Sequence, residues 1–191
     1  MHWADRTVTW LKNKKDKEKY ICSSGVSPSG HCHIGHLREA LTSNLVKESL
    51  KDEGFNSEHI HIWDDYDRFR KVPENVPDEY EKYIGMPLCD VPDPDGCHDS
   101  YAEHFMDPFQ KELKKIGMEP KFIRASEKYR SGEYTERIEE AINKKDEIRK
   151  TLNEHRKEPL EEDWWPIQVY CEECGKDFTN ITEYDEENKE I

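Results

Sequence analysis

The spacing of apolar and polar residues along the chain predicts alternating strands and helices. A short apolar run within residues 19–24 is typical of a buried strand, and apolar residues then recur at helical spacing from Leu37 to Leu50. Residues 59–63 alternate in character, which indicates a second strand. A strand–helix–strand order implies an α/β fold with a parallel sheet and a right-handed crossover. Ligands are then expected at the carboxyl ends of the strands.

The rest of the pattern predicts further helices around a loop-rich middle. Residues 1–19 are typical of a helix, and residues 73–96, rich in proline, glycine and acids, predict ordered loops around a short helix at 78–83. Ser100 and Glu103 form a capping-box pattern at the start of a helix that reaches Ile116. A short strand over 120–123 and one long charged helix from Gly132 to about Arg156 complete the prediction.

The turn between the first predicted strand and helix has the composition of a phosphate-binding site. It runs from Gly25 to His36, and its small residues lead directly into a helix N-terminus. Free N–H groups and the helix dipole converge at such an end and favour an anion. His33 and His36, three residues apart, share one face of the first helical turn. Gly35 has no Cβ, which would let a base or ribose lie against the backbone. The alternative is that the two histidines only cap the helix.

Composition and net charge limit the binding partners and the cellular location that the chain can have. With 29 Lys and Arg against 43 Asp and Glu, the net charge of −14 weighs against simple nucleic-acid binding. Basic residues gather at 12–19 and 144–157 but alternate with acids, as on solvated helix faces. No apolar run approaches the roughly 20 residues of a membrane span, and the first residues lack the features of a signal peptide. We therefore expect a cytoplasmic protein without membrane contact.

Six cysteines without an export signal favour metal ligands or free thiols over disulfides. Cys171 and Cys174 have the C-x-x-C spacing of half a zinc site. A second group lies within twelve residues: Cys97, His98 and His104 with either Asp93 or Asp95 would give a mixed ligand set that suits tetrahedral zinc. The alternative is that Cys97 is a small buried residue and the histidines are polar groups at a helix start.

Three aspartates follow the second predicted strand on the same edge of the sheet as the histidines. Asp64, Asp65 and Asp67 either pair structurally with Arg68 and Arg70 or recognise a cationic substrate or a ribose. The residues alone leave both interpretations open.

The histidine turn and several other segments resemble a known protein family. His33-Ile34-Gly35-His36 resembles the HIGH signature of class I aminoacyl-tRNA synthetases and related nucleotidyltransferases. The string from Gly25 to Gly30, with Leu37-Arg38-Glu39, resembles the class I lysyl-tRNA synthetases, found mainly in archaea. The further segments that carry the resemblance cover nearly the whole chain in order: 64–73, 83–88, 92–98, 100–105 and 170–175.

The resemblance implies a Rossmann-like fold, its first half at residues 1–85. It implies that residues 86–191 continue the α/β domain and contain an inserted zinc-bearing subdomain. The implied reaction attaches lysine to tRNA(Lys) through lysyl-adenylate, with ATP as substrate and Mg²⁺ bound to it. The implied site residues fall into four groups: His33 and His36 on the triphosphate; Pro28, Ser29, Gly30 and Gly35 around ATP and the adenylate; Gly25, Ser27 and Asp65 at the lysine; and Asp93, Cys97, His98, His104, Cys171 and Cys174 on Zn²⁺.

The sequence also departs from the family pattern. It has no Lys-Met-Ser-Lys-Ser-like string, which normally assists the leaving pyrophosphate, and no second C-x-x-C pair. We therefore expect the amino-terminal part of a catalytic domain, inactive alone, with the missing carboxyl-terminal half as its partner. The alternatives are another HIGH-type nucleotidyltransferase, a synthetase for glutamate or cysteine, or a non-catalytic zinc-stabilised module that binds ATP or tRNA.

Overall fold

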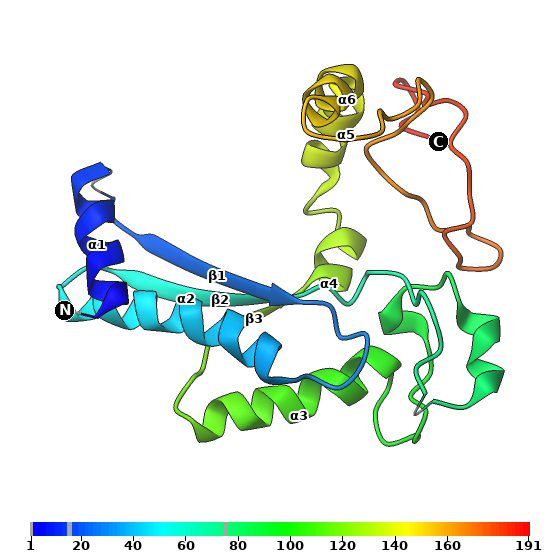
Figure 1. The fold of residues 1–191 in the computed structure, drawn as a ribbon. Helices are drawn as coiled ribbons and strands as arrows, with labels where there is room; N and C mark the ends of the chain where they lie inside the picture. Colours follow the sequence, from blue (N-terminus) through cyan, green and yellow to red (C-terminus); the bar gives the residue numbers. More distant parts are fainter. Residues whose placement is uncertain (1, 15–16, 75) are drawn as a thin grey trace.

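A computed structural model describes residues 2–14, 17–74 and 76–191 of the chain (Figure 1). Its sheet contains β1 (Tyr20–Val26), β2 (Ser57–Trp63) and β3 (Lys121–Arg124) in that spatial order, with both strand pairs parallel. The register pairs Ser24 with His61 and Trp63 with Arg124. The α/β class and the parallel sheet predicted from the sequence are confirmed.

Helices α2 (Ile34–Asp52) and α3 (Tyr101–Lys115) lie on the same face of the sheet in Figure 1. Between them and the strands lies the main core, where Trp63, Phe105 and Phe109 are almost fully buried. Helix α1 (Trp3–Lys14) packs on α2 through Val8 and Leu50. Residues 1 and 15–16 of the predicted first helix lie outside the described residues.

Buried histidines occupy the covered face of β2. His59 and His61 are 3% and 0% exposed, and each ring approaches the Ser24 hydroxyl at 2.8 Å, through Nε2 and Nδ1 respectively. The His61 ring also contacts Trp63, with ring centroids 4.7 Å apart. The alternation of residues 59–63 therefore places imidazoles, as well as the indole, in the interior.

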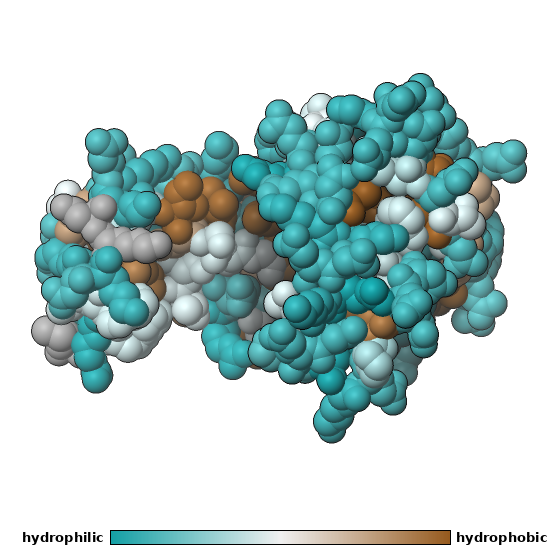
Figure 2. Space-filling model, turned by 90° about the horizontal axis from the view of Figure 1, so that it is seen from above, coloured by the Kyte–Doolittle hydropathy of each residue, from teal (hydrophilic) through white to brown (hydrophobic). Residues whose placement is uncertain are grey.

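The opposite face of the sheet is less covered. Within the described residues no helix runs along it in Figure 1, and Ile21 of the edge strand β1 is 60% exposed. Figure 2 shows brown hydrophobic surface on this side, next to hydrophilic side chains. Across the described ranges, no helix has both the length and the apolar character that a membrane crossing requires.

Loops and short helices form the rest of the chain. The expected short helix is the 3₁₀ helix η1 (Asp78–Tyr83), and a second one, η2 (Leu88–Asp90), follows. Helix α4 (Ala125–Arg130) leaves β3 directly. One apolar core includes residues on both sides of position 85, from Trp63 to Tyr101. The domain boundary at 85/86 stays a prediction.

Two details of the sequence prediction were wrong. The long charged helix is two helices, α5 (Thr135–Asn143) and α6 (Lys145–Asn153), because the backbone of Lys144 between them leaves the helical conformation, with φ −105° and ψ 16°. The capping box is only half formed. Ser100 accepts the N–H of Glu103, but the Glu103 carboxylate pairs with Arg124 instead of the cap.

Candidate functional site

The turn between β1 and α2 lies at the carboxyl edge of the sheet (Figure 1). His33 is the N-cap of α2, and its Nδ1 accepts the N–H of Gly35 at 3.0 Å. His36 Nδ1 accepts the N–H of His33 at 3.1 Å, and the two rings stack with centroids 3.9 Å apart. The helix-capping alternative is therefore realised, but it engages only one nitrogen of each ring.

This capping fixes the chemistry of the other ring nitrogens. A neutral imidazole whose Nδ1 accepts a hydrogen bond carries its proton on Nε2, so both histidines present an Nε2–H donor. Burial, and next the proximity of His33, lower the pKa of His36 and favour this neutral form. The first turn of α2 contains no acidic residue that would repel an anion. Two N–H donors thus lie at the positive end of a 19-residue helix.

The three glycines of the turn lie in different surroundings. A Cβ on Gly35 would lie 2.8 Å from the His33 ring, so this glycine makes room for the capping histidine. The expectation that Gly35 also lets a base or ribose lie against the backbone stays a prediction. A Cβ on Gly25 would lie 3.1 Å from the carbonyl oxygen of Ile62 on β2. A Cβ on Gly30 would meet no atom within 4 Å, so of the three glycines only Gly30 borders open space.

The other predicted residues of the turn divide into exposed and buried ones. Ser29 is exposed, and its carbonyl accepts a hydrogen bond from the Tyr101 hydroxyl at 2.9 Å. Ser27 is half-buried, and its hydroxyl donates to Asp67 at 3.3 Å. Pro28 is fully buried, so it shapes the turn from inside and offers no surface to ATP.

Asp65 does not lie where the lysine-binding prediction requires. Its carboxylate is fully buried, accepts Nε–H of Arg124 at 2.8 Å, and also accepts the N–H and hydroxyl of Ser126 at 2.8 and 2.6 Å. Each carboxylate oxygen thus has a protein partner, and the complete burial leaves no surface for a ligand. The structural interpretation holds for Asp65, although its partner is Arg124 and not Arg68 or Arg70.

Asp64 and Asp67 face a cleft of about 760 Å³ at the carboxyl end of β2. Asp67 pairs with Arg70 at 2.8 Å, as the sequence suggested. Burial, and next the negative charges of Asp67 and Asp65, raise the pKa of Asp64. A bound cation would stabilise its ionised form. Aromatic residues that sequence reasoning missed also line the cleft: Tyr66, Tyr129 and Tyr170. They come from three distant segments, and no local pattern in the sequence brings them together.

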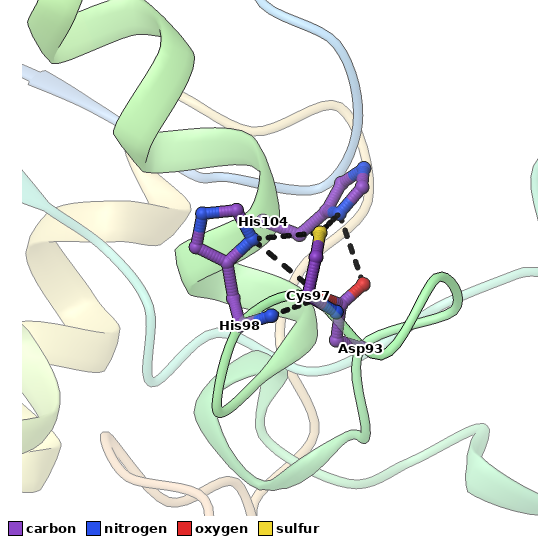
Figure 3. Close-up of side chains that lie close together, drawn as sticks. All are labelled: Asp93, Cys97, His98 and His104. Carbon is purple, nitrogen blue, oxygen red and sulfur yellow. Dashed lines mark hydrogen bonds and ion pairs between the residues drawn. The ribbon is translucent and has the colours of Figure 1, made fainter.

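The predicted metal cluster is assembled where the loop before α3 meets the first turn of that helix, which carries His104 (Figure 3). One donor atom from each of Asp93, Cys97, His98 and His104 lies within 4.8 Å of the others. Cys97 Sγ is 3.0 Å from His98 Nδ1 and 3.5 Å from His104 Nδ1, which is itself 2.9 Å from Asp93 Oδ1. In tetrahedral zinc sites the corresponding donor–donor edges are about 3.3–3.6 Å. Two of these distances match such edges or lie close to them and two are a few tenths of an ångström shorter, counting the 3.5 Å between His98 Nδ1 and Asp93 Oδ2. With a small outward shift of the side chains, the residues present fit a zinc ion.

The surroundings of the cluster support the same conclusion. His98 Nε2 lies 3.4 Å from Asp107, and His104 Nε2 lies 3.7 Å from the exposed Asp95. Carboxylates at the outer nitrogen are typical partners of metal-binding histidines. Asp95 thus lies outside the donor set, and Asp93 inside it. Sequence reasoning missed Asp107, whose signal is its position one helical turn beyond His104 on α3.

Asp93 also shapes the loop. Burial alone would raise the pKa of its carboxyl group, but the N–H groups of Asp95, Cys97 and His98 bond to it and hold the pKa well below its usual range. Asp93 is therefore a carboxylate that the loop closes around. A charged group buried in this way needs these donors or a cation.

Cys171 and Cys174 form a separate turn. The N–H of Gly175 donates to the Cys171 carbonyl at 2.8 Å, with Gly175 at a φ of 70°. Hydrogen bonds from the N–H groups of Cys174 and Glu173 and from the Cys174 thiol lower the pKa of the Cys171 thiol. The turn packs beside Gly85 through Asp177, whose carboxylate pairs with Arg68 at 3.0 Å. In the part of the chain that the structure describes, no further metal ligand groups with this pair.

Comparisons with known proteins address the whole chain. Residues 1–191 match the model of the family described as tRNA synthetases class I (K). The chain is 50% identical over 192 residues to a lysine–tRNA ligase of Pyrococcus furiosus, in a match covering 98% of this chain. It is 44% identical to that of Methanocaldococcus jannaschii over 100% of the chain, and 39% identical to that of Treponema pallidum over 97%.

Each of these matches covers 36% of the relative's own length. The family match extends over every residue of the chain, including the histidine turn and the metal cluster. The resemblance inferred from the motifs is thus confirmed, and the chain belongs to the class I (K) tRNA synthetases.

Proposed function

We propose that this chain forms the amino-terminal part of the catalytic domain of a lysine–tRNA ligase and supplies its triphosphate-binding turn. The observation that carries the proposal is the pair of Nε2–H donors of His33 and His36, oriented by their capping hydrogen bonds at the start of α2. The names of the relatives support lysine and tRNA(Lys) as substrates. Because the chain spans about a third of those relatives, the complete activity belongs to the full-length protein.

The proposed reaction has two steps. A carboxylate oxygen of lysine attacks the α-phosphate of ATP, which forms lysyl-adenylate and releases pyrophosphate. The lysyl group then passes to the terminal adenosine of tRNA(Lys), and AMP leaves. Negative charge grows on the phosphate oxygens during the first step, and preoriented N–H donors stabilise that charge. Mg²⁺ would accompany ATP and neutralise part of its charge.

The other turn residues have supporting roles in this proposal. Exposed Ser29 and the open space at Gly30 leave the backbone accessible to the phosphates. Gly25 and Ser27 lie at the end of β1, where we place the amino-acid end of the adenylate. Asp64 and Asp67 remain candidates for a cationic group of the substrate, whereas Asp65 is excluded by its burial.

Zinc has a structural place in the proposal. Asp93, Cys97, His98 and His104 would hold one ion and fix the loop before α3, and Cys171 with Cys174 would hold a second ion more weakly. A structural zinc ion supplies folding free energy because its ligands converge only in the folded chain. The first site supplies four protein donors and the second only two.

Paired substitutions of the histidines test the proposal. Asn places its side-chain oxygen near the position of Nδ1, so His33→Asn and His36→Asn preserve the helix caps but remove the Nε2–H donors. His33→Gln and His36→Gln extend an amide toward the Nε2 position instead. We expect lysine-dependent ATP–pyrophosphate exchange by the full-length protein to fall about 100-fold or more in each Asn variant, since single donors of this kind contribute that much. The Gln variants should retain more activity.

The readouts separate donor loss from unfolding. Thermal unfolding of His33→Asn should match that of the wild type, because Asn is a good N-cap. His36 is the third residue of the helix, and thermal unfolding of His36→Asn shows whether the Asn oxygen still accepts the N–H of His33. Exchange at the wild-type rate in both Asn variants would contradict the catalytic assignment. Exchange supported by glutamate or cysteine in place of lysine would contradict the substrate.

A further inference from the structure

The hydroxyl of Tyr101 connects the metal loop to the nucleotide turn. Tyr101 is the first residue of α3 and follows the N-cap Ser100, close to His98 and His104. Its side chain is fully buried, and its hydroxyl donates to the carbonyl oxygen of Ser29 at 2.9 Å. The two residues are 72 positions apart in the chain. Tyr101 therefore extends from the start of α3 to the main chain of the turn.

This hydrogen bond is important because the turn has few others. Within the described residues, the main chain of segment 27–32 makes one hydrogen bond, and it is the bond from Tyr101 to Ser29. Segment 27–32 lies between the last residue of β1 and the N-cap of α2, so neither the sheet ladder nor the helix fixes it. Its position therefore depends strongly on side chains that pack against it.

A second contact joins the same elements. The His31 ring meets the Phe105 ring edge-on, with centroids 5.0 Å apart, and Phe105 is 2% exposed. Phe105 also packs against the ring of His104, with centroids 4.7 Å apart. His104 is a donor of the metal cluster, so the first turns of α3 contact the metal ligands on one side and the nucleotide turn on the other.

We propose that Tyr101 is a positioning residue that holds segment 27–32 in its ligand-binding shape, and that metal in the Asp93–His104 cluster stiffens this support. The metal fixes the start of α3, and α3 fixes the turn through Tyr101 and Phe105. The proposal rests on the proposed function only where it concerns ATP. Its structural part, the support of the turn, stands on the contacts alone.

The structural part is tested by amide hydrogen exchange on this chain. Tyr101→Phe removes the hydroxyl and keeps the buried ring. The matched control is Tyr80→Phe, since Tyr80 is also buried in the main core and its hydroxyl makes no hydrogen bond within the described ranges. The amides that can report on the segment are the hydrogen-bonded ones that directly follow it, at residues 33 and 35–37. We expect faster exchange at these amides in Tyr101→Phe only. Equal exchange in the wild type and Tyr101→Phe would overturn the positioning role.

The metal connection is tested on the same chain stripped of metal. Adding Zn²⁺ alone should slow exchange at the bonded amides of residues 33 and 35–37 in the wild type, and should slow it less in Tyr101→Phe. A Zn²⁺ effect confined to residues 93–107 would show that the cluster and the turn are independent and would overturn the connection.

The functional part is tested in the full-length protein by pyrophosphate exchange. One hydrogen bond of this kind is worth a factor of about five, so Tyr101→Phe should raise KM for ATP about five-fold. It should raise KM for lysine less, because only Ser27 of the segment is placed near the amino acid. A merely structural loss would lower kcat and leave both KM values unchanged, which would overturn the role toward ATP. If the wild type shows no lysine-dependent exchange while the amide result holds, the proposed function fails and the positioning role stands.

Discussion

Two groups of histidines in this molecule contain similar residue types but have opposite environments. In the cluster of Asp93, Cys97, His98 and His104, two imidazoles meet a carboxylate and a thiol in a partly accessible loop. On β2, His59 and His61 converge on the neutral Ser24 hydroxyl, beneath aromatic side chains. The first group combines anionic donors with access from solvent. The second has neither.

The comparison shows what distinguishes a metal site from a polar core. Burial without an anion disfavours a charged imidazole, so desolvation, and next the charge of His59, lowers the pKa of His61 to about 4. A divalent ion there would meet the same penalty. Residue type alone therefore does not identify ligands, and the accompanying carboxylate and thiol decide the matter.

The largest expected effect comes from breaking the metal cluster. Cys97→Ala with His98→Ala should remove one equivalent of zinc per chain and lower the thermal unfolding temperature, because structural zinc supplies folding free energy directly. Zinc content by elemental analysis and thermal unfolding on the same samples measure both effects.

The matched control for this variant is Cys22→Ala, which removes a half-buried thiol from β1. It should keep the full zinc content. The same should hold for His59→Gln, because the β2 group is not expected to bind metal. Loss of zinc from either control, with the cluster variant unaffected, would reverse the comparison.

The next effect is the pH dependence of the buried pair. The lowered pKa of His61 means that the unfolded chain binds a proton near pH 6.5 while the folded chain does so only near pH 4. Stability from this group is complete above pH 6.5 and is lost as the pH falls to 4. The loss is up to about 3 kcal/mol for a shift of this size. Urea unfolding of metal-free protein between pH 7 and 4 measures it.

The control for the pH experiment is His61→Asn, in which an amide oxygen can replace Nδ1 beside Ser24. This variant is less stable at every pH because the ring is lost, but its stability should fall less steeply with acid. Parallel pH profiles of the wild type and His61→Asn would show that His61 contributes nothing to acid unfolding.

The smallest effect concerns the Cys171–Cys174 turn. With two protein donors, we expect zinc here to exchange readily, whereas zinc in the four-donor cluster is retained. Competition with a chromophoric chelator should release metal in two phases. Cys171→Ala with Cys174→Ala should abolish only the weaker phase. If metal were released in a single tight phase and this phase disappeared in the variant, the stronger site would be at Cys171 and Cys174 and not at the four-donor cluster.

Much of the fold could be predicted from the sequence, because the patterns that indicate its elements are local. The strands, α2 and α3 follow from period and caps, and the four-donor cluster lies within twelve residues. The histidine turn was found in the same way. Its chemistry was only half visible, since the capping bonds that orient both rings depend on exact geometry.

Other features depend on partners distant in sequence and could not be predicted. The partner of Asp65 is 59 residues away at Arg124. The charged residues next to Asp65 in the sequence therefore gave no indication that it is buried. Tyr101 lies in the core, and nothing in the local sequence pattern indicates its hydrogen bond to Ser29, 72 positions away. The break between α5 and α6 at Lys144 contains neither proline nor glycine, and the apolar residues on its two sides would fit one face of a continuous helix, so no local signal marks it.

The buried carboxylate of Asp65 also has a consequence for how the sheet forms. Strand β3 has four residues, and so short a parallel strand can slip along β2 at little cost in ladder hydrogen bonds. In the observed register, Trp63 is opposite Arg124, and Arg124 and Ser126 reach Asp65. A slip of one residue would leave a buried charge without partners, at a cost of about 3–5 kcal/mol. One side chain thereby selects a single alignment for the last strand.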